Sequence, residues 1–114
     1  MPSKRNPLGL NALQLKTLTL LQQLARLSDY AHPADEEGSV VLIRLPQPHG
    51  DHFHIGEAVV ASRDATGLRN PSVWAALERK GVVRSTPPTA VVTALGLDYD
   101  TGLRETILHL ADHA

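Results

Sequence analysis

Histidines and carboxylates gather in one short stretch of the chain, residues 49–57. Imidazoles and carboxylates are ligands that suit zinc and other transition metals, and His49, His52 and His54 carry the imidazoles here. On an extended segment His52 and His54 face the same side, whereas His49 belongs to the preceding turn. The stretch is therefore either a polar turn of solvated histidines or a metal- or pH-sensing site.

We expect no tight metal site in this stretch, because nothing in the sequence fixes the turn and tight sites need ligands oriented by further hydrogen bonds. His49, His52 and His54 are the weak candidates, and we expect no cofactor. His109 and His113, at helical spacing near the C-terminus, could also bind a metal ion together. We favour the simpler explanation that cationic imidazoles meet the negative end of a helix there.

Basic residues concentrate between Arg63 and Arg84, although the chain as a whole has a formal net charge of −1. This stretch holds five of the eleven basic residues against two acids, a local charge of about +3. Trp74 lies inside it and either covers the edge of the core or offers an exposed contact. The polar side chains around Trp74 form either a solvated face or contacts to phosphates and bases.

The sequence gives no support for catalysis, and we expect no enzyme. It contains no G-x-S-x-G elbow, phosphate-binding loop, H-E-x-x-H or G-x-G-x-x-G motif, and it has no cysteine nucleophile. Aromatic residues make up only 4% of the chain, too few for a platform that stacks single-stranded bases.

The length and composition favour a single small domain. A chain of 114 residues can bury one modest core, and without cysteine it can form neither disulfides nor thiolate metal sites. We expect a soluble cytoplasmic protein that does not enter membranes, because the N-terminus lacks a signal-peptide core and no long apolar run occurs. Residues 1–9, with two prolines, predict a flexible arm, and residues 10–114 the domain.

The elements of the first half follow from leucine spacing and turn residues. Eight leucines lie within 10–27, which predicts a helix that Asn11 caps. Residues 28–39 are acidic and broken by proline and glycine, so we expect an exposed loop. The β-branched run 40–45 predicts a strand, and Phe53–Ile55 a short partner strand.

The second half predicts helices on both sides of a two-stranded ribbon. Alanines and valines at roughly helical spacing predict a first helix over 57–65. Asn70 and Pro71 start a second helix, which Gly81 ends. A ribbon follows over residues 82–93, and Thr93 then caps a C-terminal helix that reaches residue 112 and is disturbed at Gly102.

Three local motifs resemble those of winged helix-turn-helix regulators. LERKGVVR at 77–84 is similar to the ending by which a recognition helix passes into the first wing strand. AVVTALG at 90–96 is similar to the junction of the second wing strand with the last helix in MarR-like and PadR-like bacterial regulators. EAVVASRDATGL at 57–68 is similar to the first helix and turn of a helix-turn-helix.

The resemblance implies an α+β winged helix-turn-helix fold with an N-terminal leucine-rich helix. In that fold the helix-turn-helix spans 57–80, the wing 82–93 and the C-terminal helix 94–112. It also implies a DNA-binding transcriptional regulator that contacts double-stranded DNA as a homodimer. The residues it places at the major groove are Arg69, Asn70, Ser72 and Arg79, and those it places at phosphates are Lys80, Arg84, Lys4 and Arg5.

Two departures from the family pattern keep other functions open. Pro71 starts the recognition helix late, and the wing segment STPPT has no arginine or lysine to enter a minor groove. The first alternative is a winged-helix module that binds a protein partner and not DNA. The second is a metal- or pH-responsive sensor that uses residues 49–57.

We expect a homodimer because eight leucines within 10–27 exceed what one small core can cover. The helix over 10–27 and the C-terminal helix, where Leu103, Ile107 and Leu110 form another apolar stripe, would together join the two copies.

Overall fold

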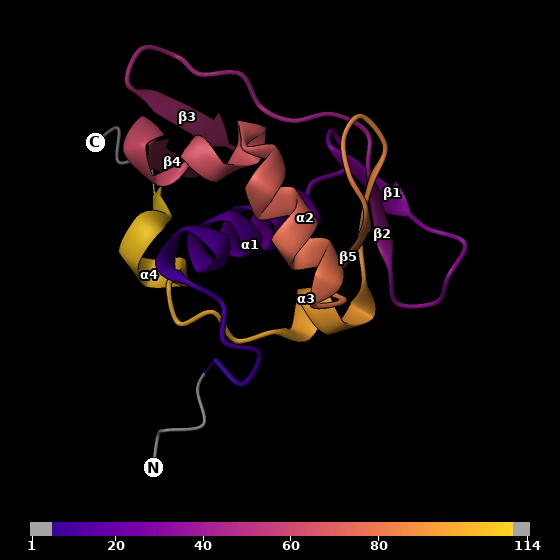
Figure 1. The fold of residues 1–114 in the computed structure, drawn as a ribbon. Coiled ribbons are helices and arrows are strands. Elements are labelled where there is room, and N and C mark those ends of the chain that lie inside the picture. Colours follow the sequence, from indigo (N-terminus) through magenta and orange to yellow (C-terminus); the bar gives the residue numbers. More distant parts are fainter. Residues whose placement is uncertain (1–5, 111–114) are drawn as a thin grey trace.

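The leucine-rich helix lies in the middle of the molecule (Figure 1). In the computed structural model, which describes residues 6–110, this helix is α1 (Ala12–Leu24). Asn11 caps it as predicted, and the Gln14 side chain completes a capping box by accepting from the Asn11 backbone N–H. Leu18, Leu20, Leu21 and Leu24 are fully buried, although they point to different sides of the helix. The wide apolar arc is thus covered from several sides within one chain.

The first antiparallel sheet, sheet A, has the strand order β1-β2-β6-β5. Its strands are β1 (Ala31–Pro33), β2 (Val40–Leu42), β5 (Val83–Ser85) and β6 (Ala90–Val92). The structure confirms the predicted strand at its first residues, 40–42, and it also confirms the ribbon. The predicted exposed loop 28–39 is partly wrong, because β1 lies within it and Ala31 is buried against the core.

The second sheet, sheet B, has the order β3-β4-β7 and corrects the predicted helix over 57–65. Its strands are β3 (His52–Ile55), β4 (Ala58–Ala61) and β7 (His109–Leu110). Gly56, with φ +63°, starts the two-residue turn that pairs Ile55 with Ala58. Alternate residues of β4, Ala58 and Val60, are buried, which is the burial pattern of a strand.

Two short 3-10 turns connect sheet B to the next helix. These are η2 (Ser62–Asp64) and η3 (Thr66–Arg69), and α2 (Pro71–Arg79) follows. The predicted helix over 70–80 is confirmed. The Asn70 carboxamide accepts a hydrogen bond from the Ser72 N–H, and Pro71 occupies the first turn. Gly81, with φ +80°, ends the helix. With no first helix before α2, the expected helix-turn-helix over 57–80 is corrected to a strand, two 3-10 turns and one helix.

The predicted C-terminal helix over 94–112 is broken in two. Thr93 caps α3 (Ala94–Asp98) as predicted, and α4 (Arg104–Ile107) follows only after an extended stretch. Tyr99 leaves α3 in an extended conformation and Gly102 has φ +72°, so the disturbance expected at Gly102 separates two elements. Residues 111–112 lie outside the described part of the chain.

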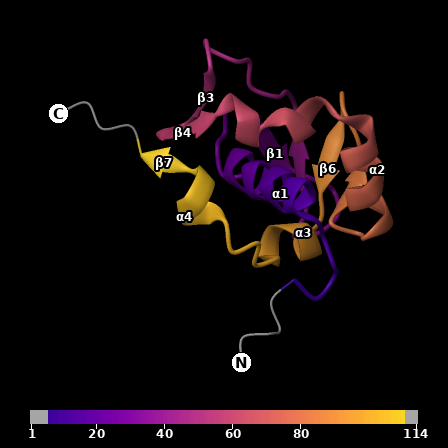
Figure 2. The same cartoon turned by 60° about the vertical axis from the view of Figure 1, so that its left-hand side comes forward.

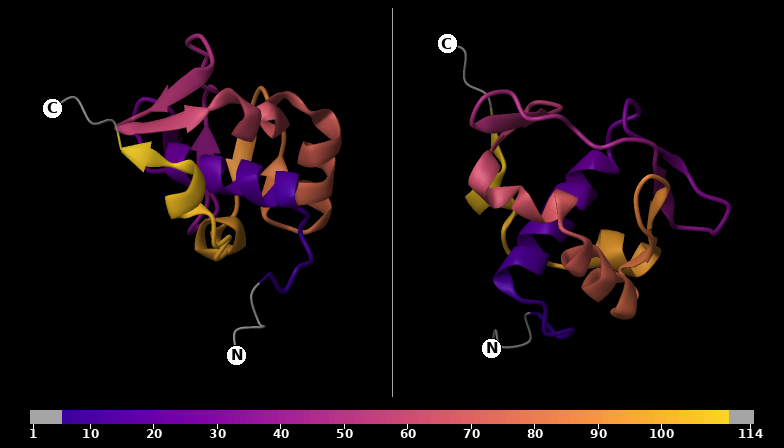
Figure 3. Two further views of the ribbon diagram at one scale, coloured as in Figure 1. Left: turned by 90° about the vertical axis from the view of Figure 1, so that its left-hand side faces the viewer. Right: turned by 45° about the horizontal axis from the view of Figure 1, so that its top comes forward.

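α1 runs across sheet A, with α2 near one of its ends and β7 near the other (Figures 2 and 3). At the start of the described chain, residues 6–9, the end of the stretch expected to be a flexible arm, lie against the domain. The Asn6 carboxamide bonds to the Leu10 backbone and accepts from the Tyr99 hydroxyl at 2.7 Å. Lys4 and Arg5 lie outside the described residues.

None of the helices between residues 6 and 110 has the length and apolarity needed to cross a membrane.

Candidate functional site

An open groove of about 770 Å³ lies beside α2. One wall is the outer face of α2, where Pro71, Ala75 and Glu78 follow each other at helical spacing. The opposite walls are the extended segment 43–47 that leaves β2 and the β5–β6 hairpin tip at 86–88 (Figure 1). The groove therefore lies between the expected recognition helix and the expected wing.

The groove has an apolar floor. Its buried lining residues are Leu42, Leu68, Trp74 and Ala90, each at most 3% exposed. The Trp74 indole N–H donates to the Leu68 carbonyl oxygen at 2.9 Å, so its one polar atom is satisfied. Of the two roles expected for Trp74, the structure thus favours the core role: it packs in the core and presents only a small part of its ring to the groove.

Charged side chains stand at the rim of the groove. The Arg44 guanidinium lies 4.9 Å from the centre of the Tyr30 ring, and its Nε donates to the Asp29 carbonyl oxygen. Arg69 precedes α2 and donates to the Gln47 side chain at 3.2 Å. Glu78 lies in the last turn of α2. Arg69 and Glu78 thus place a cation and an anion at opposite ends of α2, and Arg44 is a second cation beside the groove.

The backbone of the segment beside β2 is open to a further partner. After the Ile43 N–H, which donates to the Tyr30 carbonyl oxygen, the N–H and C=O groups of residues 44, 45 and 47 have no hydrogen-bond partner among the described residues. An extended segment with unused backbone groups next to an apolar channel is the arrangement that accepts a peptide strand.

Several residues predicted to contact DNA are already bound within the chain. The Asn70 side-chain oxygen accepts the hydrogen bond that caps α2, and Arg69 donates a hydrogen bond to the Gln47 side chain at the groove rim. Arg84 forms an ion pair with Glu36, at 2.9 Å between Nε and Oε1. The remaining predicted residues, Ser72, Arg79 and Lys80, are exposed on or just after α2.

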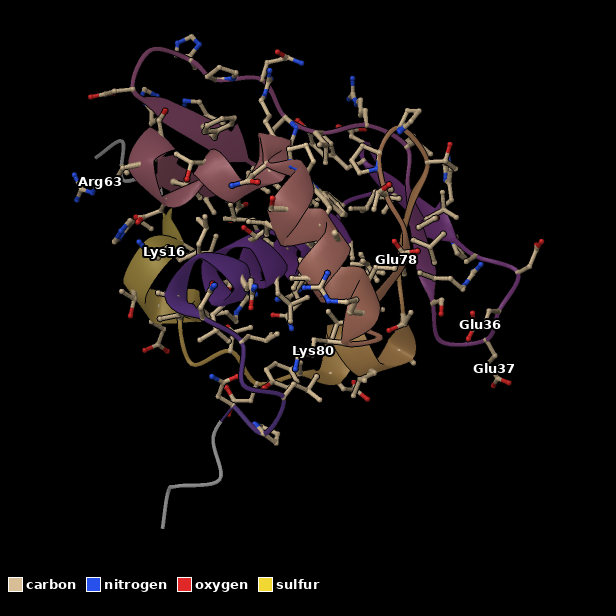
Figure 4. All side chains as sticks on the ribbon, in the orientation of Figure 1. Lys16, Glu36, Glu37, Arg63, Glu78 and Lys80 are labelled. Carbon is tan, nitrogen blue, oxygen red and sulfur yellow. The ribbon has the colours of Figure 1, made fainter. Side chains whose placement is uncertain are left out.

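The basic residues form no continuous surface along α2. Glu78 lies on the side of α2 towards the hairpin, and Lys80 lies at the lower end of the helix (Figure 4). Lys16 and Arg63 are at the opposite side of the same view, and Lys16 is paired with Asp64 at 2.8 Å. The local excess of positive charge counted in the sequence is therefore spread over separate places in the fold.

The three histidines of the polar stretch come together at the start of β3. Their ring centroids are 5.4 Å apart for His49 and His52, 5.6 Å for His49 and His54, and 4.8 Å for His52 and His54. As expected from strand alternation, His52 and His54 share the outer face of β3 while Phe53 is buried. Glu57 lies in the turn at the other end of β3 and is not part of this cluster.

Asp51 belongs to the same cluster. Its carboxylate oxygen lies 3.2 Å from His52 Nδ1. The hydrogen bond from His52, together with a backbone hydrogen bond and the charge of His52, lowers the pKa of the exposed Asp51 carboxyl below its ordinary value. His109 lies on β7 rather than on a helix, and His113 falls outside the described residues, so the expected helical pair is not formed on the described part of the chain.

The leucines that motivated a homodimer are covered within the chain. Leu10, Leu18, Leu20, Leu21 and Leu24 belong to the core, and Leu13, Leu15 and Leu27 pack against it. Ile107 is buried as well. The homodimer stays a prediction, but the leucine helix offers no free apolar face to support it.

The groove was not predicted from the sequence. Its walls come from residues 43–47, 71–78 and 86–88, and only the packing of α2 against the sheet brings them together. The one available signal was the apolar run that continues past the strand through Ile43 and Leu45. No protein-family model, curated protein or solved structure matches the chain.

Proposed function

We propose that this domain is a protein-interaction module whose groove binds an extended, mainly apolar segment of a partner protein. The observation that carries the proposal is the outer face of α2. Where a DNA-reading helix would expose cations, this face presents Pro71, Ala75 and Glu78 to an apolar channel.

The groove also defines the chemistry of the partner. Its floor takes apolar side chains, and the free backbone groups of residues 44, 45 and 47 suit an added strand, although Pro46 between them donates no hydrogen bond. Arg69, just before α2, favours a carboxylate on the partner at that end, and Glu78, in the last turn of α2, favours a cation at the other, while Arg44 adds a second cation to the lining. A peptide with an apolar centre and oppositely charged ends satisfies all three requirements.

The finer fold assignment belongs to the same proposal: we infer a modified winged helix. The passage from α2 through Gly81 into β5, and from β6 through Thr93 into α3, agrees with the two junction motifs. The strand and 3-10 turns at 58–69 stand where the first helix of a helix-turn-helix would be. A domain altered in this way keeps the wing and one helix, which form the groove, and lacks the helix that would brace α2 on DNA.

DNA binding remains the competing function, because Arg79 and Lys80 are exposed at the end of α2. One substitution separates the two functions. Ala75→Arg puts a long cation into the groove at an exposed position, and arginine is a good helix former, so the fold is retained. It should weaken peptide binding about tenfold or more. A DNA-reading helix would instead bind duplex equally well or more tightly with the added cation.

The experiment is a selection from displayed random linear peptides against the full chain, followed by titration of the enriched peptide. We expect enrichment of apolar sequences, loss of affinity in Ala75→Arg, and unchanged affinity in the matched control Arg79→Ala, which lies on α2 outside the groove. If no peptide is enriched, while random duplex DNA binds in a salt-dependent way and Arg79→Ala weakens that binding, the proposal is wrong and the regulator function holds.

A further inference from the structure

Two ring nitrogens of the histidine cluster, within hydrogen-bond distance of each other, are separated by nearly the distance found between metal ligands. His52 Nε2 and His54 Nε2 lie 3.1 Å apart. Imidazole nitrogens that bind one zinc ion tetrahedrally, at bond lengths of about 2.0–2.1 Å, lie about 3.3 Å from each other. The two nitrogens are therefore separated by nearly the distance that a shared metal ion requires, and the ring of His49 is within 5.6 Å of both other rings.

Asp51 sets the tautomer that a metal ligand needs. An ionised carboxylate only accepts hydrogen bonds, so His52 must donate its Nδ1–H to Asp51. When His52 is neutral, its Nε2 then carries a lone pair directed towards His54. Histidines that bind metals usually donate their other ring N–H to a carboxylate or carbonyl in this way.

The backbone orients the cluster. Gly50 turns the chain at φ +72°, and the His49 N–H donates to the His52 carbonyl oxygen at 2.6 Å. The Ser62 N–H donates to the Asp51 carbonyl oxygen at 2.8 Å, which ties the turn to the end of β4. Nothing in the sequence alone fixes this turn, whereas in the folded chain these contacts fix it.

Two changes separate the cluster from a complete site: a rotation of the His49 ring and a tautomer change of His54. Within residues 6–110, no group of three or more histidine or carboxylate side chains is arranged so that it could hold a metal ion. His49 is exposed, so its ring can turn between staggered rotamers at little cost. His54 can move its ring proton to Nδ1 by exchange with water, which frees Nε2.

We propose that His49, His52 and His54 bind one divalent transition-metal ion, with Asp51 orienting His52. The ligand set of three imidazoles suits zinc and excludes magnesium, which prefers oxygen ligands. Three protein ligands leave a coordination position for water or for a group from another molecule. This site does not depend on the groove function.

The test is calorimetric titration of the full chain with zinc sulfate at neutral pH, with magnesium sulfate as the control ion. We expect one zinc ion per chain with micromolar or tighter affinity, and no binding of magnesium. His52→Ala combined with His54→Ala should abolish binding, and Asp51→Asn should weaken it about tenfold or more. Zinc should also raise the unfolding temperature of the wild type and leave that of the double variant unchanged.

Two exposed histidines outside the cluster provide matched controls. His32→Ala on β1 and His109→Ala on β7 should bind zinc as the wild type does. The proposal is overturned if the wild type binds no zinc at micromolar concentrations, if the double variant still binds, or if His109→Ala removes binding. The circular dichroism of the metal-free variants checks that their fold is intact.

Discussion

Single residues set how closely the elements around the groove can pack. Gly67 in η3 is one of them, because it lies against α1. A Cβ built on Gly67 would lie 1.9 Å from the Thr17 hydroxyl oxygen, closer than any side chain can approach. η3 supplies Leu68 and Arg69 to the groove, so this approach determines where its floor and rim lie.

Gly67→Ala should therefore destabilise the protein by about 1–3 kcal/mol through overpacking. The backbone of Gly67 does not lie in the left-handed region, so a steric clash is the only cause expected. Denaturant unfolding measures the loss. Adding Thr17→Ala removes the clashing oxygen and should restore part of the stability. Equal losses in the single and double variants would show that the close approach to α1 is not the cause.

At the scale of elements, Thr93 joins α2, β6 and α3. Its hydroxyl donates to the Gly81 carbonyl oxygen at 2.7 Å and accepts from the Gly96 N–H at 3.1 Å. The Thr93 side chain thus caps α3 and also holds the end of β6 next to Gly81, the residue that ends α2. The position of α2 relative to sheet A, and with it the width of the groove, depends on this junction.

Thr93→Ala should cost about 1–2 kcal/mol, because it removes a helix cap and a second hydrogen bond together. Thr93→Ser keeps the hydroxyl and should retain most of the stability, which makes it the matched control. Equilibrium unfolding in urea compares the variants. If serine loses as much stability as alanine, the methyl group and not the hydroxyl holds the junction.

Elements with a local signal could be predicted from the sequence. Asn11, Asn70 and Thr93 cap helices as expected, since a side chain that bonds the next turn needs no distant partner. The strand at 58–61 was missed because its alanines and valines also fit helical spacing. The two-residue Gly56-Glu57 turn between apolar runs was the contrary signal, and pairing with β3 and β7 decided the outcome.

The candidate sites depended on contacts that are distant in the sequence. Strand alternation correctly placed His52 and His54 on one face, but the hydrogen bond between His49 and His52 that gathers the third histidine has no sequence signal. The basic stretch 63–84 predicted one charged face, whereas Arg84 on β5 forms an ion pair with Glu36 in the loop between β1 and β2. Charges can be counted along a sequence, but the surface they occupy is set by the fold.

At the scale of the whole molecule, the leucines of residues 10–27 pack within the single chain. A homodimer would therefore have to use a different surface from the leucine helix. Among the described residues, the large hydrophobic side chains that are exposed are Ile43, at 45%, and Leu95, at 48%. Ile43 lines the groove, so Leu95 on α3 is the apolar contact left for a second copy of the chain.

The predicted homodimer should sediment at twice the 12.3 kDa chain mass at tens of micromolar. Leu95→Gln removes the exposed apolar contact and should return the mass to that of one chain. Ala75→Arg, in the groove, should leave the dimer intact. A wild-type mass of 12.3 kDa at these concentrations would contradict the homodimer.

We propose that the groove beside α2, and not a basic face, is the binding surface of the domain. The most direct measurement is backbone amide mapping by NMR of isotope-labelled protein, titrated in parallel with the selected peptide and with random duplex DNA. We predict that the peptide shifts the amides of residues 43–45, Ala75 and Thr86, and that duplex leaves the spectrum unchanged at moderate salt. Salt-dependent shifts of residues 70–80 with duplex, and no shifts in the groove with peptide, would contradict it.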